Sequence, residues 1–436
     1  MTLVKNFDEL ATSPARKVAL EIIEAGLAAI QPEEVIGSQF TVHGSQLDVS
    51  GQKFDLDQFE RVFLVGFGKG SAEISRLIEE KLGERLTAGW DIDVRREKGE
   101  GRREKSKINF VEGTHPLPSE KNVEFTKMVV GELEGRLTEE DLVLVVVCGG
   151  GSALFTWPHC SIATLLEVNR ALLKSGATIE EMNTVRKKLD KVKGGGLARI
   201  LYPARVVSLV FSDVPGNNLA TIASGPTVED PTTVEEALGI LGKLGNLGIR
   251  KEDLVETPKE GKFFEKVNNI LSLSNRTALD AVEKKGREWG LPVRVVSSQI
   301  QGEARRVGAD LVREIKKEPG RAMFLAGGET TVAVKGEGQG GRNQEVVLGG
   351  MRELLGEPQD ENILIASVAS DGWDNGEFAG AIGDEETRRK AESAEADPEY
   401  FLENNDSYGF FEKTGDGIVT GRLPSNVSDL MIVLKS

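Results

Sequence analysis

Leu142-Val-Leu-Val-Val-Val-Cys-Gly-Gly-Gly-Ser-Ala153 is the stretch that decides the fold. Its first six residues are all apolar, which is typical of a central strand of a parallel sheet that is covered on both faces. The glycine turn follows at the carboxyl end of this strand, where open α/β sheets bind their ligands. The sequence therefore predicts an α/β core with a functional loop directly after residue 147.

Strand and helix patterns alternate on both sides of this stretch. An amphipathic helix with Ser13 as its N-cap is expected over 14–30. The segments that follow alternate as a doubly wound parallel sheet requires, with strands at 62–65 and 92–94 and helices at 71–82 and 119–133. Beyond Pro226 the chain becomes polar before a second alternation begins. We therefore expect two α/β domains, a Rossmann-like one with a doubly wound parallel sheet at 1–235 and a smaller one with a mixed sheet at 236–436.

Composition excludes several classes of protein. The chain has 436 residues, and its net charge of −16 argues against nonspecific nucleic-acid binding. No apolar run is long enough for a membrane span, and the N-terminal sequence lacks a signal-peptide profile, so a cytoplasmic protein is expected. Two cysteines cannot build a disulfide framework, and the three histidines are too scattered for a His-rich zinc site. Any metal should be a hard cation bound by carboxylates.

The first half of the chain carries four groups that could bind anions or act on them. Gly66-Phe-Gly-Lys-Gly-Ser71 completes neither a P-loop nor a dinucleotide fingerprint, yet it places Gly68 and Lys69 at a strand end. The other candidates are Gly150, Gly151 and Ser152 as an oxyanion loop, Asp213 as a general base or Mg²⁺ ligand, and Arg186 and Lys193 as anion contacts. Tight turns, an Asx turn at Asp213 and a solvated basic face are the alternatives.

The second half offers a glycine-rich segment and a set of carboxylates. Six glycines lie within 327–345, and a helix that begins at Arg342 would direct its positive end toward an anion. Gly340, Gly341, Arg342 and Asn343 are therefore expected to form part of a polyanion cradle. Glu329, Asp371 and Asp374 are the candidate Mg²⁺ ligands, with a capped turn as the alternative for the two aspartates. The basic segment 95–107 is expected to be a solvated loop.

Taken together, these motifs resemble the class II glycerate kinase family, the glycerate 2-kinases with a MOFRL-type C-terminal domain. The most specific pieces are Glu181-Met-Asn-Thr-Val-Arg-Lys, Lys193-Gly-Gly-Gly196, Ala223-Ser-Gly-Pro-Thr227, Gly340-Gly-Arg-Asn-Gln-Glu345 and Asn426-Val-Ser-Asp-Leu430. The resemblance implies two α/β domains with an active-site cleft between them, and phosphoryl transfer from ATP to D-glycerate with Mg²⁺. Asn217 and Asn218 stand where the family usually has an acidic pair, so no metal role is carried over to them.

On this hypothesis Lys69 and Arg342 hold the transferring phosphoryl group and the substrate carboxylate, in an order that the sequence leaves open. Ser152 and the neighbouring amides would hold the glycerate carboxylate, and Asp213 would position or deprotonate the accepting hydroxyl. The rivals are an NAD(P)H-dependent hydroxypyruvate reductase, with Asp91 or Asp93 as the ribose carboxylate, and a sensor without catalytic activity. Whether copies of the chain form a homo-oligomer stays open.

Overall fold

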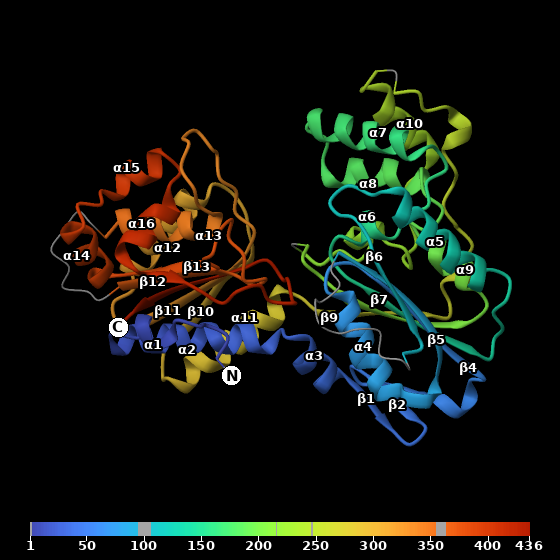
Figure 1. Cartoon of the computed structure of the whole chain (residues 1–436), viewed down its shortest axis with the longest axis horizontal. Helices are drawn as coiled ribbons and strands as arrows, with labels where there is room; N and C mark the ends of the chain where they lie inside the picture. The colour runs from blue at the N-terminus through green and yellow to red at the C-terminus, as the bar shows by residue number, and fades with distance from the viewer. Residues whose placement is uncertain (1, 95–105, 215, 246, 355–362) are drawn as a thin grey trace. The chain divides into compact units, whose positions relative to one another are not determined.

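The computed structural model describes residues 2–94, 106–214, 216–245, 247–354 and 363–436, so the basic segment falls almost wholly outside the described residues. The chain forms two compact units, which we call the central unit (35–272) and the terminal unit (1–34 with 273–436). Both are α/β, as the sequence predicts (Figure 1). The division differs from the expected one at 235/236, because the N-terminal helices belong with the C-terminal half.

A six-stranded sheet in the order β6-β5-β4-β7-β8-β9 forms the centre of the central unit. Strands β6 to β8 pair in parallel, which confirms the predicted doubly wound core. Residues of β7 are buried along their whole length, as expected for a strand covered on both faces. The strands are β4 (Arg61–Phe67), β5 (Leu86–Asp93), β6 (Ile108–Glu112), β7 (Asp141–Val147), β8 (Arg205–Phe211) and β9 (Val267–Leu273).

Helices cover both faces of this sheet. Phe63, Val65 and Phe67 alternate along β4 and face a core that also contains residues of α5 and α9. Helix α4 packs against β4, β5 and β7 outside this core cluster. A separate helical cluster is formed by α7, α8 and α10. These helices are α4 (Ser71–Leu82), α5 (Glu120–Leu133), α7 (Ile162–Lys174), α8 (Ile179–Lys188), α9 (Gly196–Leu201) and α10 (Val234–Gly242), with the short α3 (Pro32–Gln39) and α6 (Gly151–Leu154).

The central unit also contains a small antiparallel sheet that the sequence did not indicate. It consists of β1 (Phe40–His43), β2 (Gln46–Val49) and β3 (Gln52–Asp55), joined by two tight turns. The turns use glycines with positive φ, Gly44 and Gly51, and the strands are only four residues long, so the apolar alternation is too short to stand out.

The terminal unit has a mixed sheet in the order β10-β11-β15-β12-β13-β14, which confirms the second part of the predicted fold class. Only β10 and β11 pair in parallel among the register pairs of this sheet. The last strand of the chain, β15, lies between β11 and β12. The strands are β10 (Val293–Ile300), β11 (Ala322–Gly328), β12 (Ile363–Ala369), β13 (Gly380–Gly383), β14 (Gly417–Ile418) and β15 (Asp429–Lys435).

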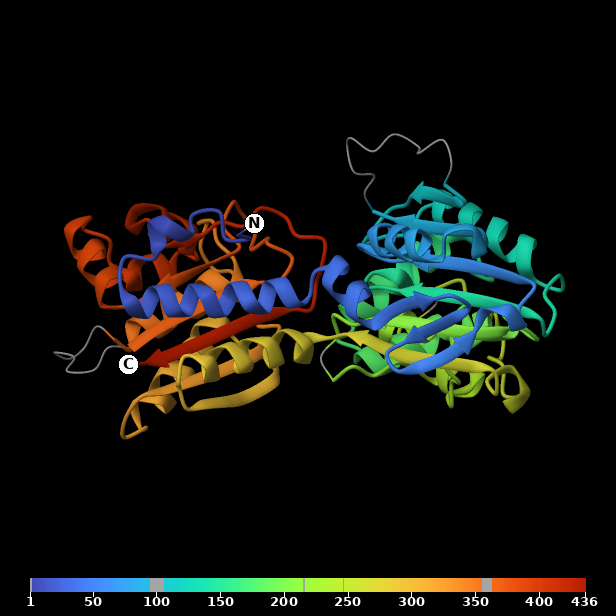
Figure 2. The same cartoon turned by 90° about the horizontal axis from the view of Figure 1, so that it is seen from below.

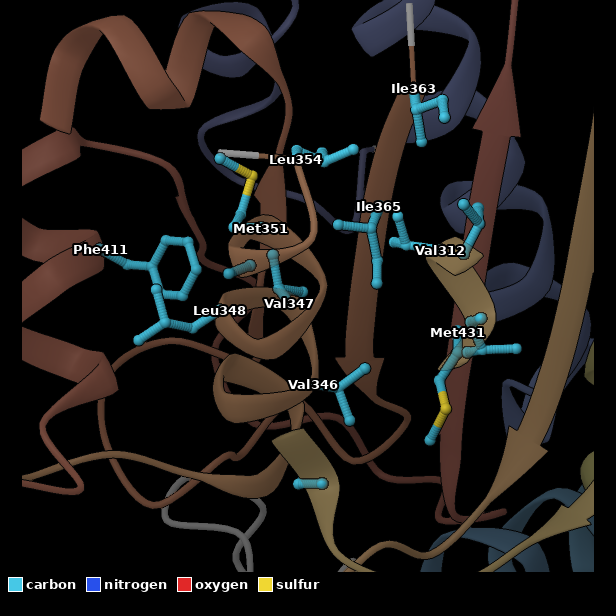
Figure 3. Packing of buried hydrophobic residues seen from close by; sticks show 14 of the residues in the cluster. Val312, Val346, Val347, Leu348, Met351, Leu354, Ile363, Ile365, Phe411 and Met431 are labelled. Atoms are coloured by element: carbon cyan, nitrogen blue, oxygen red, sulfur yellow. The ribbon is translucent and has the colours of Figure 1, made fainter. Parts of the chain in front are cut away.

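Helix α13 supplies the centre of the core on one face of this sheet. Val346, Val347 and Met351 pack with residues of β12, β15 and α12 (Figure 3). On the described residues, α12 and α13 also lie against each other, and α14 to α16 complete this layer. The helices are α12 (Ala304–Lys316), α13 (Arg342–Arg352), α14 (Glu385–Ser393), α15 (Pro398–Glu403) and α16 (Ser407–Thr414).

The N-terminal helix α2 (Pro14–Ala29) lies beside α11 (Asn275–Glu288) and β15, after the short α1 (Phe7–Leu10) (Figure 2). Ser13 accepts a hydrogen bond from Arg16 N, so the predicted N-cap is confirmed. The Arg16 side chain is fully buried and pairs with Asp384 at 2.8 Å and Asp416 at 2.7 Å. These charge-assisted bonds and the apolar face of α2 place the N-terminal segment in the terminal unit. None of the helices in the described ranges has the length and apolar character that crossing a membrane requires.

Candidate active site

Two glycine turns meet at the carboxyl edge of the parallel sheet. The first follows β4 and contains Gly68, Lys69 and Gly70, and the second follows β7. Lys69 N donates to Gly149 O at 2.8 Å, which ties the turns together. Gly68 has φ +120°, and a Cβ there would lie 2.5 Å from Cys148 O, so only glycine allows this approach. The exposed Lys69 side chain is thereby presented from a fixed backbone.

The N-terminus of α4, expected to receive a phosphate, is instead occupied by a carboxylate of the chain itself. Asp93 Oδ2 accepts from Gly70 N at 2.9 Å and from Ala72 N at 3.3 Å. Asp91 is fully buried and accepts from the hydroxyls of Ser71 and Ser75 at 2.9 and 2.6 Å. Burial raises the pKa of Asp91 to about 8, with a further contribution from the charge of Asp93. Neither aspartate is therefore open to a ribose.

The loop after β7 keeps its backbone donors available. Among the described residues, no hydrogen bond is recorded for the amides of Gly149, Gly150 or Ser152. The side chains of Asp213, His115 and Lys69 lie beside this loop. A Cβ on Gly149 would lie 2.0 Å from Asp213 Oδ2, and one on Gly150 would lie 3.0 Å from His115 Nε2 and 3.4 Å from Lys69 Cγ. The structure thus places Lys69, Gly150, Ser152 and Asp213 together at this edge of the sheet.

His115 is a site residue that sequence reasoning missed. It follows β6, a strand that the sequence did not predict, and so its place at the carboxyl edge of the sheet gave no signal. Burial, and then the charge of Lys69, lowers the pKa of His115 to about 4. Its imidazole is therefore neutral at physiological pH and offers both a donor and an acceptor beside the loop.

Ser152 is linked to α8 through a second serine. The Ser152 and Ser224 hydroxyls lie 2.9 Å apart, and Ser224 donates to Asn183 Oδ1 at 3.0 Å. Of the two predicted basic anion contacts, Lys193 is buried and already pairs with Asp190 at 2.8 Å. Arg186 donates through Nε to Asn169 Oδ1 at 2.7 Å, and no ion pair is recorded for it within the described ranges.

In the terminal unit, Arg342 is held by two carboxylates. Its Nε and Nη2 donate to the two oxygens of the buried Asp429 at 2.7 and 3.1 Å, and Nη1 donates to Glu329. Three of its five N–H groups are thus engaged. Burial raises the pKa of Asp429 to about 6 against the opposing effect of Arg342, so the pair stays ionised at neutral pH. Asp429 was not among the predicted site residues.

Asp374 occupies the N-terminus of α13, so this predicted anion cradle is also filled from within. Asp374 Oδ1 accepts from Asn343 N at 3.1 Å and Oδ2 accepts from Gln344 N at 2.9 Å. A Cβ on Gly341 would lie 2.3 Å from Asp374 Oδ1, which explains the glycine before Arg342. Asp374 is therefore a helix cap, whereas the sequence offered a metal ligand or a capped turn.

The glycines before this helix serve close packing against another segment of the unit. A Cβ on Gly336 would lie 2.2 Å from Asn404 O, one on Gly338 would lie 2.3 Å from Asp406 Cβ, and one on Gly340 would lie 2.1 Å from Ser407 Oγ. The Asn405 side chain accepts from the amides of Lys335 and Gly336 at 2.7 and 3.0 Å. Much of the backbone expected to bind a polyanion is thus already bonded within the unit.

The carboxylates expected to bind Mg²⁺ do not form a common cluster. No group of three or more His, Cys, Asp or Glu that could hold a metal occurs among the described residues. Asp374 caps α13, Glu329 pairs with Arg342, and Asp371 Oδ1 accepts from Trp373 N at 3.0 Å. Mg²⁺ commonly uses only one or two carboxylates together with phosphate oxygens and water. A partly exposed Asp371 is compatible with that pattern.

Comparison with known proteins identifies the family. Residues 18–252 match the family described as a domain of unknown function, DUF4147, and residues 322–429 match the MOFRL family. A D-glycerate 2-kinase from Thermotoga maritima is 36% identical to the chain and covers 96% of it, with 98% of the relative covered. The chain belongs to the glycerate 2-kinase family.

The fold of this family agrees with the structure. A crystal structure of a glycerate kinase from Thermotoga maritima superposes with a TM-score of 0.82 at 33% identity and covers 96% of the chain and 99% of its own length. A relative from Agrobacterium vitis, 35% identical over 86% of the chain and 87% of its own length, carries the provisional name hydroxypyruvate reductase. Membership of the kinase family confirms the resemblance seen in the sequence, and the two α/β units confirm the predicted fold class.

Proposed function

We propose that the protein transfers the γ-phosphoryl group of ATP to the 2-hydroxyl of D-glycerate. The observation that carries this proposal is the loop at 149–152, which lies beside Lys69, His115 and Asp213, and in which no hydrogen bond is recorded among the described residues for the amides of Gly149, Gly150 and Ser152. Such a loop suits an anionic substrate, because backbone amides, a cation and a candidate base meet at one strand edge. Family membership supports the same reaction.

In the proposed mechanism, the loop amides and Lys69 stabilise the negative charge that spreads over the transferring phosphoryl oxygens. The substrate hydroxyl loses its proton to Asp213 as its oxygen attacks the γ-phosphorus, and the bond to the β-phosphate oxygen breaks to release ADP. Asp213 suits this role because it follows β8 and its carboxylate lies against Gly149. Arg342 would contact a phosphate through its unengaged N–H groups, while Asp429 fixes its orientation.

Mg²⁺ would neutralise the nucleotide phosphates. We assign Asp371 as its protein contact, since one carboxylate oxygen of Asp371 has no recorded hydrogen bond in the described chain. Glu329 remains a second candidate if Arg342 releases it. Asp374 is left out of this set because its two oxygens bind the α13 amides.

A hydroxypyruvate reductase is the less favoured function. It would need a carboxylate for the nicotinamide ribose after β5, but Asp91 is fully buried and Asp93 bonds to the amides at the start of α4. The glycine turn after β4 therefore lacks the features of a dinucleotide site.

The test is a coupled assay with Mg²⁺, ATP and D-glycerate. We expect a product that enolase consumes without added phosphoglycerate mutase, since enolase acts on 2-phosphoglycerate. A product that requires the mutase would show a 3-kinase, and would contradict the proposed position of transfer. Absence of any phosphoglycerate, together with NAD(P)H oxidation in the presence of hydroxypyruvate, would favour the reductase.

A further inference from the structure

Helix α8 carries a positive group that no acid neutralises among the described residues. Arg186 is partly buried, and its only recorded hydrogen bond within the described part of the chain is the one from Nε to Asn169 Oδ1. The next two residues behave differently, because Lys187 and Lys188 both pair with the buried Asp230. An uncompensated charge is costly to bury, so a site of this kind calls for an anionic partner.

Asn183 provides a second unused donor on the same face of α8. It lies three residues before Arg186, a spacing that places two side chains next to each other on a helix. Its side chain is 4% exposed, and its Nδ2 group is buried without a hydrogen-bond partner. A buried amide donor left unbonded is rare in folded proteins and costs free energy. A pair of donors at this spacing on one helix is a kind that the two acceptor oxygens of a carboxylate can satisfy.

Ser224 connects this face of α8 to the loop at 149–152. It lies in the short η3 (Ile222–Ser224), which contacts both α6 and α8. Its φ of 61° is unusual for a residue other than glycine, and the conformation is held in part by the bond from Gly194 N to Ser224 O at 3.0 Å. The strained backbone is thus fixed where the Ser224 hydroxyl can reach Asn183 and Ser152.

The direction of the hydrogen bonds determines what Ser152 presents to a ligand. Ser224 donates its single proton to Asn183 Oδ1, so Ser152 must donate to Ser224 across the 2.9 Å contact. The Ser152 hydroxyl can therefore only accept any further hydrogen bond. Ser152 therefore suits a substrate hydroxyl better than the substrate carboxylate, which differs from the role expected from the sequence.

Lys193 does not take the place of Arg186. Burial is the main cause that lowers the pKa of Lys193, and the charge of Arg186 adds to it, but the charge of Lys193 is balanced by Asp190 at 2.8 Å. Of these two basic residues, Arg186 is therefore the one for which no ion pair is recorded among the described residues.

We infer that Arg186 and Asn183 bind the carboxylate of the hydroxy-acid substrate, while Ser152 accepts a hydrogen bond from one of its hydroxyls. This assignment rests on the proposed function and adds to it. It leaves Lys69 and the amides of Gly149 and Gly150 to the phosphoryl group. It also makes Arg186 the residue that selects an acid over a neutral polyol such as glycerol.

The experiment compares Arg186→Gln with the wild-type protein. Initial rates with varied D-glycerate and varied ATP should give a KM for glycerate that rises roughly 30-fold or more, because a charged partner of the carboxylate is lost. The KM for ATP should stay within a factor of about two of the wild-type value. Arg186→Lys should recover part of the affinity, since it restores the charge without the planar fork.

Arg170→Gln is the matched control. Arg170 is exposed on the neighbouring helix α7, and the same change there should leave both KM values unchanged. Circular dichroism and thermal melting establish that each variant is folded. Titration calorimetry with D-glycerate alone should show binding by the wild type and by Arg170→Gln, and a loss of binding by Arg186→Gln.

The outcomes separate this inference from the proposed function. A folded Arg186→Gln that phosphorylates glycerate with an unchanged KM for glycerate overturns the carboxylate assignment and leaves the proposed kinase function standing. A KM that rises for ATP only has the same meaning. If the wild type transfers no phosphate to glycerate, the kinase proposal fails, and calorimetry then decides the inference. Binding of glycerate that depends on Arg186 supports it, and no binding by the wild type overturns it.

Discussion

Asp91 holds its proton because of where it lies. It is fully buried beside Asp93, and its oxygens accept from two serine hydroxyls rather than from a cation. Burial and the neighbouring charge raise its pKa to about 8, against 3.8 for the ordinary group. Between these values the folded protein keeps a proton that the unfolded chain releases, so the free energy of unfolding falls as pH rises from about 4 to about 8.

Asp91→Asn should remove this pH dependence. Asparagine cannot ionise, so we expect the difference in urea midpoint between pH 5 and pH 8 to be smaller for this variant than for the wild type. Asp57→Asn is the control, because Asp57 is exposed and pairs with Arg85 on the surface. Equal pH profiles for Asp91→Asn and the wild type would mean that Asp91 is ionised in the folded protein.

The N-termini of α4 and α13 both bind a carboxylate of the chain itself. Both helices follow a glycine, and each takes a carboxylate from a strand end or loop elsewhere in its unit, Asp93 for α4 and Asp374 for α13. The helix dipole and the unpaired amides attract an internal anion as readily as a ligand. A glycine turn before a helix is therefore not evidence of a phosphate site by itself.

Asp374→Asn should lower the stability of the terminal unit by roughly 2 kcal/mol, because hydrogen bonds to a charged group are lost. The measurement is thermal melting with and without Mg²⁺ and nucleotide. An equal loss in both conditions is expected for a helix cap. A loss that appears only with Mg²⁺ and nucleotide would contradict this interpretation and would return Asp374 to the metal ligands.

Local sequence signals predicted the elements well and the contents of the site less well. The helix α4 begins and ends at the predicted residues 71 and 82, and the buried run after residue 141 forms β7. These signals lie within a few residues of each other along the chain. The partners of Arg342 and the place of His115 depend on strands far apart in sequence, so no local pattern could reveal them.

At the scale of the whole molecule, the two ends of the chain complete one unit. Strand β15 lies inside the mixed sheet, and Arg16 of α2 pairs with Asp384 and Asp416. Chain order alone predicts two consecutive domains, because the contacts between the ends of the chain are not visible in the sequence. The arginine near the N-terminus and the apolar last strand indicate one shared unit only when their contacts are known, and the sequence alone does not show these contacts.

The fragment 35–272 should therefore fold by itself, whereas 1–235 should not. The fragment 1–235 lacks β9 and the segment around Thr257. Buried Lys188 therefore loses its bonds to Glu256 at 2.7 Å and to Thr257 at 2.8 Å. This fragment also leaves α2 without the partners of Arg16. A buried charge with fewer partners costs several kcal/mol, which is a large part of the stability of a domain.

The measurement is cooperative unfolding in urea followed by circular dichroism, with the full chain as the reference. If 1–235 unfolds as cooperatively as 35–272, the boundary lies at the earlier position and the two ends of the chain are not needed by the same unit.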